Sequence, residues 1–167
     1  MTFSVLIPAR YSSSRFPGKP LIELNGRTMI QRVYERAIKS KAAAVYVATD
    51  DERIADSVYE IGGKVVMTEA NHESGSDRIY EAASTLGLRD DEVVVNVQGD
   101  EPLIPPEAID QVARLVDQKT RMATLMTTLR HAEEVFDPNV VKVVADNSGQ
   151  ALYFSRAPIP WSRDQFQ

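Results

Sequence analysis

Short apolar runs alternate with helical patterns from the N-terminus to residue 119. Strands are predicted over 3–7, 45–49, 64–67 and 93–97, and all but the third are nearly continuous apolar runs, which is typical of buried parallel strands. Apolar residues recur at helical spacing over 29–38 and 54–61, and further helices are predicted over 77–86 and from Pro105 onward. This order predicts a Rossmann-like α/β domain with right-handed crossovers.

The pattern changes after Lys119. Strands are predicted over 122–128, 140–145 and 151–155, and the last two flank the turn sequence Asp-Asn-Ser-Gly at 146–149. We therefore expect a mixed, mostly parallel sheet with an antiparallel portion after residue 120. Residues 1–167 are interpreted as a single domain, with an α/β core over 1–120 and a mixed-sheet portion over 121–167.

Composition narrows the classes of function. The chain has 167 residues, 43% of them hydrophobic, and a formal net charge of -5, which argues against nucleic acid or an anionic membrane surface as its partner. The absence of cysteine excludes disulfides, thiolate metal sites and cysteine nucleophiles. No apolar stretch approaches the roughly 20 residues of a membrane span, and the N-terminus has no basic region of a signal peptide. We expect a cytoplasmic protein with no membrane partner.

A basic, hydroxyl-rich loop follows the first predicted strand. It carries Arg10, Ser13 and Lys19, and it lies where open α/β sheets bind their ligands, at the carboxyl end of a strand. Fixed cations and hydroxyls suit phosphate oxygens, so the loop predicts a site for a nucleotide polyphosphate. It has neither a GxGxxG fingerprint nor a Walker A sequence. The alternative is a solvated basic loop.

A second polar segment follows the predicted strand at 93–97. Asp100 offers a carboxylate for a Mg²⁺ ion that bridges nucleotide phosphates, and Gly99 lets the backbone approach closely. Gln98 lies at the same edge of the sheet. The alternatives for Asp100 are an Asx turn or a helix cap.

Two further segments are weaker candidates. Ser74 and Gly75 form a turn into a helix whose first turn carries Arg78, which suits a base edge or an anion but equally a plain capped helix. Arg156 follows the last predicted strand and could bind the carboxylate of an acidic substrate, although a surface ion pair is the competing interpretation. His72 is interpreted as a surface residue of a loop.

Together these segments resemble the 3-deoxy-manno-octulosonate (Kdo) cytidylyltransferases, also called CMP-Kdo synthetases. The resemblance is collinear over essentially the whole chain. The matching segments are IPARY (7–11), RFPGKPL (15–21), VATD (47–50), SGSDR (74–78), NVQGDEP (96–102), FDPN (136–139) and YFSRAPIP (153–160).

The resemblance implies a nucleotidyltransferase that moves CMP from CTP to an acidic eight-carbon sugar, Kdo or its 8-amino analogue, for lipopolysaccharide synthesis. It implies a Mg²⁺ cofactor held by Asp100, and a homodimer. The expected catalytic residues are Arg10, Lys19 and Asp100. The positions that match the family's CTP-binding surface are Ala9, Arg10, Ser13, Lys19, Ser74, Gly75 and Arg78. Those that match sugar contacts are Gln98 and Arg156.

The resemblance also implies a longer polypeptide. Family members continue beyond the position of Gln167 with a further Mg²⁺-binding aspartate, sugar contacts and much of the dimer interface. We therefore expect the chain to be the larger, N-terminal part of such an enzyme. The alternatives are a cytidylyltransferase for another sugar acid, such as sialic acid, and a truncated nucleotide-binding domain without catalysis.

Overall fold

All four predicted parallel strands are present in the computed structural model, which describes residues 2–12, 16–164 and 166. The strands are β1 (Phe3–Ala9), β2 (Ala44–Thr49), β3 (Val65–Met67) and β4 (Val93–Asn96). They pair in the order β3-β2-β1-β4, and every pair is parallel. The strand order reverses between β1 and β4, so the crevice at their carboxyl ends is the switch point at which α/β sheets bind ligands.

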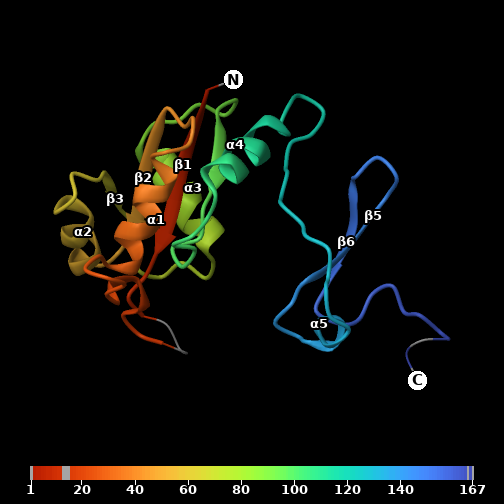
Figure 1. Ribbon diagram of the computed structural model, residues 1–167. Helices are drawn as coiled ribbons and strands as arrows, with labels where there is room; N and C mark the ends of the chain where they lie inside the picture. Colours follow the sequence, from red (N-terminus) through yellow and green to blue (C-terminus); the bar gives the residue numbers. More distant parts are fainter. Residues whose placement is uncertain (1, 13–15, 165, 167) are drawn as a thin grey trace. The chain divides into compact units, whose positions relative to one another are not determined.

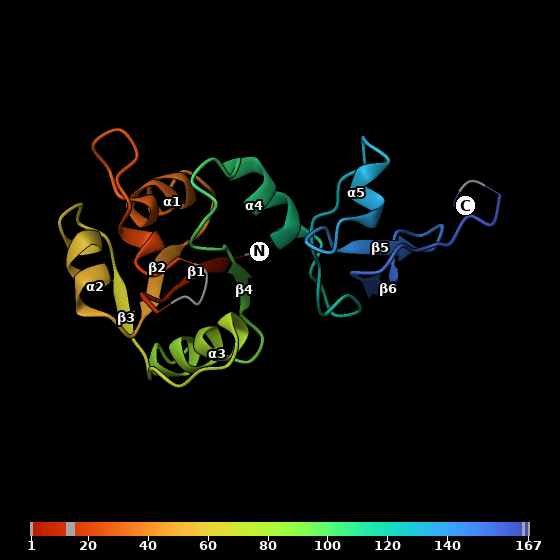
Figure 2. The ribbon, with the colours of Figure 1, turned by 90° about the horizontal axis from the view of Figure 1, so that it is seen from below.

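Helices cover both faces of this sheet (Figure 1; Figure 2). The helices are α1 (Met29–Ala37), α2 (Glu52–Tyr59), α3 (Gly75–Thr85) and α4 (Pro106–Arg114). Figure 2 shows α3 alone on one face, with α1 and α4 on the other. The core is divided accordingly: Ile30, Ile54 and Ile109 pack in one cluster, whereas Ala82 packs with Leu6 in a second. The alternation of apolar runs and helical spacing thus produces the predicted Rossmann-like layers.

Helix α3 begins two residues before the predicted start because its N-terminus is capped. The Ser74 hydroxyl accepts a hydrogen bond from the Asp77 N–H, and the Asp77 carboxylate accepts one from the Ser74 N–H. This reciprocal capping box satisfies two backbone donors that the helix itself leaves unpaired. The hydrogen bond from the Ser74 hydroxyl also holds the pKa of Asp77 below its usual value.

The chain divides into two compact units, Met1–Ala123 and Thr124–Gln167. The second contains α5 (Glu133–Phe136) and the antiparallel pair β5 (Lys142–Ala145) and β6 (Ala151–Ser155). The predicted hairpin is therefore confirmed. It forms a separate two-stranded sheet and does not extend the parallel one.

The strand predicted over 122–128 is wrong. This segment has no regular secondary structure, and Met122 and Met126 are 89% and 67% exposed. The prediction rested on apolar and β-branched residues, but a strand also needs a neighbour for its backbone hydrogen bonds. Within the described part of the chain, no strand pairs with this segment.

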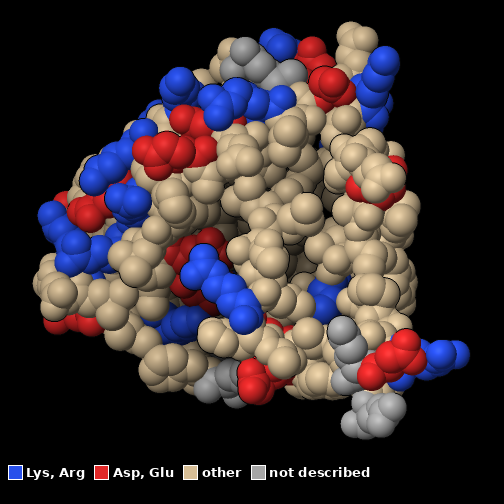
Figure 3. Space-filling view, turned by 45° about the vertical axis from the view of Figure 1, so that its right-hand side comes forward, with Lys and Arg blue, Asp and Glu red and all other residues tan. Residues whose placement is uncertain are grey.

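Charged side chains of both signs lie on the surface of the protein (Figure 3). Figure 3 shows basic side chains next to acidic ones on the face that it presents. Among the residues that the structure describes, none of the helices combines the length and apolar character that a membrane crossing requires.

Candidate active site at the carboxyl edge of the parallel sheet

The segments after β1 and β4 meet at the switch point because the two strands are neighbours. Gly99 lies so close to β1 that a Cβ atom on it would be 2.9 Å from the Pro8 carbonyl oxygen. This close approach places the start of the basic loop beside the segment that carries Gln98 and Asp100. The predicted approach of the Gly99 backbone to a bound ligand stays a prediction.

Lys19 and Asp100 form an ion pair across this edge. The Lys19 Nζ donates to Asp100 Oδ2 at 2.7 Å, and the side chains are 41% and 51% exposed. The backbone at this point is fixed, because Lys19 begins the short 3₁₀ helix η1 (Lys19–Leu21), which packs against α1 and α2. Such a half-exposed pair is held weakly by its own attraction, so both groups are available to a phosphate and a cation.

The remaining residues of the predicted phosphate loop are placed unevenly. Ala9 ends β1 and is buried opposite Thr49 of β2. Arg10 follows it and is exposed at the same edge. Ser13 lies outside the described residues, so its predicted phosphate contact stays a prediction.

The N-terminus of α3 lies next to the end of β1. A Cβ atom on Gly75 would be 3.4 Å from the Pro8 ring, which is ordinary van der Waals contact. Ser74 and Gly75 are exposed there. The Ser74 hydroxyl also donates to Asp77 at 2.6 Å, so the capped-helix interpretation holds for the side chain. The backbone of Ser74 and Gly75 is exposed, and its contact with the base of a nucleotide stays a prediction.

Arg78 points into the protein. Its side chain is 3% exposed, and its guanidinium hydrogen-bonds the Thr68 hydroxyl. A second guanidinium nitrogen lies 3.0 Å from Asp50 Oδ1, in an ion pair that lacks the angle of a good hydrogen bond. Arg78 therefore ties α3 to the carboxyl ends of β2 and β3. Its contact with a nucleotide stays a prediction.

Sequence reasoning missed the role of Asp50 and Thr68. Asp50 directly follows β2, and Thr68 directly follows β3. Asp100 was identified as a polar residue that follows a buried strand. Asp50 and Thr68 also follow buried strands, so the same criterion would have identified them.

His72 is more than a surface loop residue. Its ring hydrogen-bonds the Glu81 carboxylate of α3, and its side chain is only 17% exposed. The Glu81 carboxylate also accepts from the Glu69 N–H. The His72 hydrogen bond lowers the pKa of Glu81. The pair fastens the loop that leads into the N-terminus of α3.

The site offers little for a metal ion except Asp100. No group of three or more His, Cys, Asp or Glu side chains among the described residues is arranged to hold a metal. Mg²⁺ commonly takes one or two protein carboxylates and completes its shell with substrate phosphates and water. Asp100, half exposed beside Lys19, fits that mode of binding. Gln98 lies beside it and donates to the Asn96 side chain at 2.9 Å.

Arg156 belongs to the second unit. Its guanidinium donates to the Pro138 carbonyl at 2.7 Å. This partner is a carbonyl group, whereas the alternative interpretation expected a carboxylate in a surface ion pair. Its own carbonyl accepts from Lys142 Nζ at 2.6 Å, and Lys142 also donates to the Asp137 carbonyl. The exposed Arg156 side chain thus has a fixed base, and its contact with a sugar stays a prediction.

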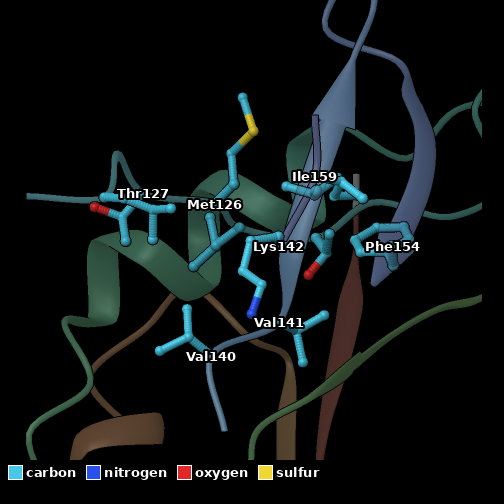
Figure 4. Close-up of a pocket in the computed structure, with 11 residues that line it drawn as sticks. Met126, Thr127, Val140, Val141, Lys142, Phe154 and Ile159 are labelled. Atoms are coloured by element: carbon cyan, nitrogen blue, oxygen red, sulfur yellow. The ribbon is translucent and has the colours of Figure 1, made fainter. Parts of the chain in front are cut away.

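The second unit contains a pocket of about 390 Å³ with a mostly apolar lining (Figure 4). Lys142 is the charged residue among those that line it, and its nitrogen already donates to two carbonyl groups. An acidic sugar needs fixed cations and hydrogen-bond donors. We therefore do not assign this pocket to the sugar.

The close approach at Gly99 predicts a specific defect. Gly99→Ala is expected to destabilise the protein by about 1–3 kcal/mol, because the added methyl group has to displace the Pro8 carbonyl. Gly75→Ala is the matched control, since its methyl group makes only ordinary contact with Pro8. Chemical denaturation measures both. Equal stability of the two variants would show that the end of β1 and the segment after β4 can move apart without a loss of stability.

Known proteins are similar to this chain over almost its whole length. The family profile described as cytidylyltransferase matches residues 4–167. The chain is 58% identical to a 3-deoxy-manno-octulosonate cytidylyltransferase of Vibrio vulnificus, over 99% of this chain and 66% of the relative. The enzyme of the same name from Saccharophagus degradans is also 58% identical, over 100% of this chain and 66% of the relative. The chain therefore spans 66% of the length of these relatives.

A solved structure is also similar to this chain. The CMP:2-keto-3-deoxy-manno-octonic acid synthetase complexed with CTP superposes with a TM-score of 0.84 and is 40% identical, over 98% of this chain and 68% of that one. The similarity in sequence and the similarity in fold point to the same family. The chain belongs to the cytidylyltransferase family.

Proposed function

We propose that the protein containing this chain transfers CMP from CTP to Kdo, or to its 8-amino analogue, and releases pyrophosphate. The identity to relatives named as Kdo cytidylyltransferases supports the activity and the sugar. The observation that carries the proposal is the pair Lys19 and Asp100, which places a cation and a carboxylate together at the sheet's switch point. The activated sugar serves lipopolysaccharide synthesis, in keeping with the resemblance.

In this proposal the triphosphate lies across the carboxyl ends of β1 and β4. Lys19 and Arg10 bind phosphate oxygens, with Ser13 as a further donor. The buried Ala9 and the exposed N-terminus of α3, at Ser74 and Gly75, form the surface for the cytosine and ribose. Backbone N–H groups at a helix N-terminus can donate to such a ligand.

Mg²⁺ is the proposed cofactor, with Asp100 as its protein ligand. When bound, the ion neutralises charge on the phosphates of CTP. Lys19 leaves Asp100 for a phosphate when the nucleotide binds, which frees the carboxylate. Their half-exposed pairing supports such an exchange.

Gln98 is proposed to contact the sugar. For Arg156, in the second unit, the resemblance supports a contact with a carboxylate group. The anomeric hydroxyl oxygen gives up its proton to water and forms a bond to the α-phosphorus of CTP, while the bond from that phosphorus to the bridging oxygen of the β-phosphate breaks. Lys19 and Arg10 stabilise the charge that develops on the departing pyrophosphate. Arg78 contributes by holding α3 in place.

Two broader features belong to the same proposal. The reaction is proposed to take place in the cytoplasm. The resemblance supports a homodimer of the full-length protein. Neither nucleic acid nor a membrane is a partner in this account, in line with the net charge of -5.

A pyrophosphate-release assay tests the proposal. The protein receives CTP and Mg²⁺ with Kdo, 8-amino-Kdo or sialic acid in parallel, and release is expected with one of the first two. Release with sialic acid alone would show that sialic acid, and neither Kdo nor its 8-amino analogue, is the substrate. CTP binding without release for any sugar would favour a nucleotide-binding domain without catalysis.

Lys19 provides a test of the nucleotide site. Lys19→Ala is expected to weaken CTP binding by about tenfold or more, because a charge-assisted contact to phosphate is lost. Calorimetry measures the affinity, and the loss should shrink as salt concentration rises. Lys41→Ala removes an exposed lysine in the same unit and serves as the control. Equal CTP affinity of the two variants would remove Lys19 from the site.

A further inference from the structure

The ring of Tyr11, at the start of the basic loop, lies close to both Arg53 and Gly18. The Arg53 guanidinium carbon lies 3.4 Å from the centre of the ring. Gly18 contacts the ring as well, because a Cβ atom on that glycine would lie 3.1 Å from Tyr11 Cε2. An arginine stacked on a tyrosine is attracted both by its charge and by its flat contact area.

Tyr11 and Gly18 are also joined through their backbones, near the two ends of the loop. The Gly18 N–H donates to the Tyr11 carbonyl at 2.9 Å, and Gly18 has a φ of 74°. A side chain at position 18 would be strained by this φ and would also press on the Tyr11 ring. Tyr11 directly follows Arg10, and Gly18 directly precedes Lys19. The Tyr11–Gly18 contact therefore sets the spacing of the two cations assigned to the phosphates.

Arg53 is itself fixed by Asp51. Its Nη2 lies 2.6 Å from Asp51 Oδ2, and its Nε lies 3.0 Å from Asp51 Oδ1. Asp51 is also the N-cap of α2, where it accepts from the Arg53 N–H. The Arg53 hydrogen bond lowers the pKa of Asp51. The two-point contact leaves the guanidinium plane free to cover Tyr11.

We propose that Arg53 is a positioning residue for the triphosphate site: it holds the Tyr11 ring on Gly18 and so keeps Arg10 and Lys19 at the spacing that CTP requires. The inference rests on the proposed function, because the ligand is the one assigned there. Arg53 acts through Tyr11, and its charge is already paired with Asp51.

The experiment compares CTP with CMP, which lacks the β- and γ-phosphates. Arg53→Ala is expected to weaken CTP binding by about fivefold, the order of a cation–π contact at a partly exposed site, and to leave CMP binding unchanged. General damage to the fold would weaken both ligands. Arg89→Ala is the control, because Arg89 is likewise paired with an aspartate two residues away, in a pair whose two side chains are 76% and 77% exposed.

Two more variants separate positioning from direct contact. Arg53→Lys keeps the charge but loses the planar stack, so it should weaken CTP binding almost as much as Arg53→Ala. Full affinity with lysine would overturn the inference that the planar guanidinium on the Tyr11 ring is what matters. Tyr11→Leu combined with Arg53→Ala should bind CTP no more weakly than Tyr11→Leu alone, whereas independent effects that multiply would also overturn it.

The outcomes also distinguish this inference from the function on which it rests. Wild-type protein that fails to bind CTP would refute the proposed function. Wild-type protein that binds CTP, with an Arg53→Ala variant that binds it equally well, would refute only the role of Arg53.

Discussion

Replacing Asp100 with alanine is expected to lower Mg²⁺-dependent pyrophosphate release by about a thousandfold, since a metal that neutralises phosphate charge supplies several kcal/mol of transition-state stabilisation. Asp100 is the carboxylate that the structure places against Lys19 at the switch point. The rate is measured with saturating CTP and sugar over a range of Mg²⁺ concentrations.

Binding experiments show whether the metal is the cause. Without Mg²⁺, Asp100→Ala should bind CTP at least as tightly as wild type, because Lys19 no longer has an internal partner. Addition of Mg²⁺ should then strengthen CTP binding in wild type but not in the variant. Asp90→Ala removes the same charge from an exposed position and should behave as wild type. Full activity of Asp100→Ala would remove this residue from the metal site.

Replacing Asp50 with alanine is expected to destabilise the first unit by about 3–5 kcal/mol, because it leaves the buried Arg78 guanidinium without its counter-charge. Thr68 remains as a hydrogen-bond partner but carries no charge. Chemical denaturation of the variant and the wild type measures the difference.

Asp91→Ala is the matched control for this effect. It breaks the Arg89–Asp91 pair, whose side chains are 76% and 77% exposed, and its effect on stability should be far smaller. A double variant, Asp50→Leu with Arg78→Met, should recover much of the loss, since it removes both charges together. If Asp50→Ala and Asp91→Ala changed stability equally, the buried ion pair would not be what fastens α3.

The order and type of elements in the first unit could be predicted because three of the four strands are nearly continuous apolar runs and helical spacing separates the strands. The prediction failed at 122–128, where composition favours a strand but no neighbour supplies hydrogen bonds. Pairing is a property of the whole fold, and local sequence does not contain it. The hairpin around residues 146–149 succeeded because its turn residues and both strands are adjacent in the chain.

The site shows the same division. The meeting of Lys19 with Asp100 could be predicted because their segments follow two buried strands, and neighbouring parallel strands bring such segments to one edge. The inward direction of Arg78 could not, because it depends on how α3 packs on the sheet. Arg53 and Tyr11 are in contact although they are 42 positions apart in the sequence. The residues around each of them do not indicate that the two side chains meet.

The central claim is that the carboxyl edge of β1 and β4 holds CTP. Amide chemical shifts, measured by NMR of the isotopically labelled protein during a CTP titration with Mg²⁺, test it residue by residue. The account predicts the largest changes at Arg10, Lys19, Gly75, Gly99 and Asp100. Changes confined to residues 124–164, or no change at these five positions at saturating CTP, would contradict it.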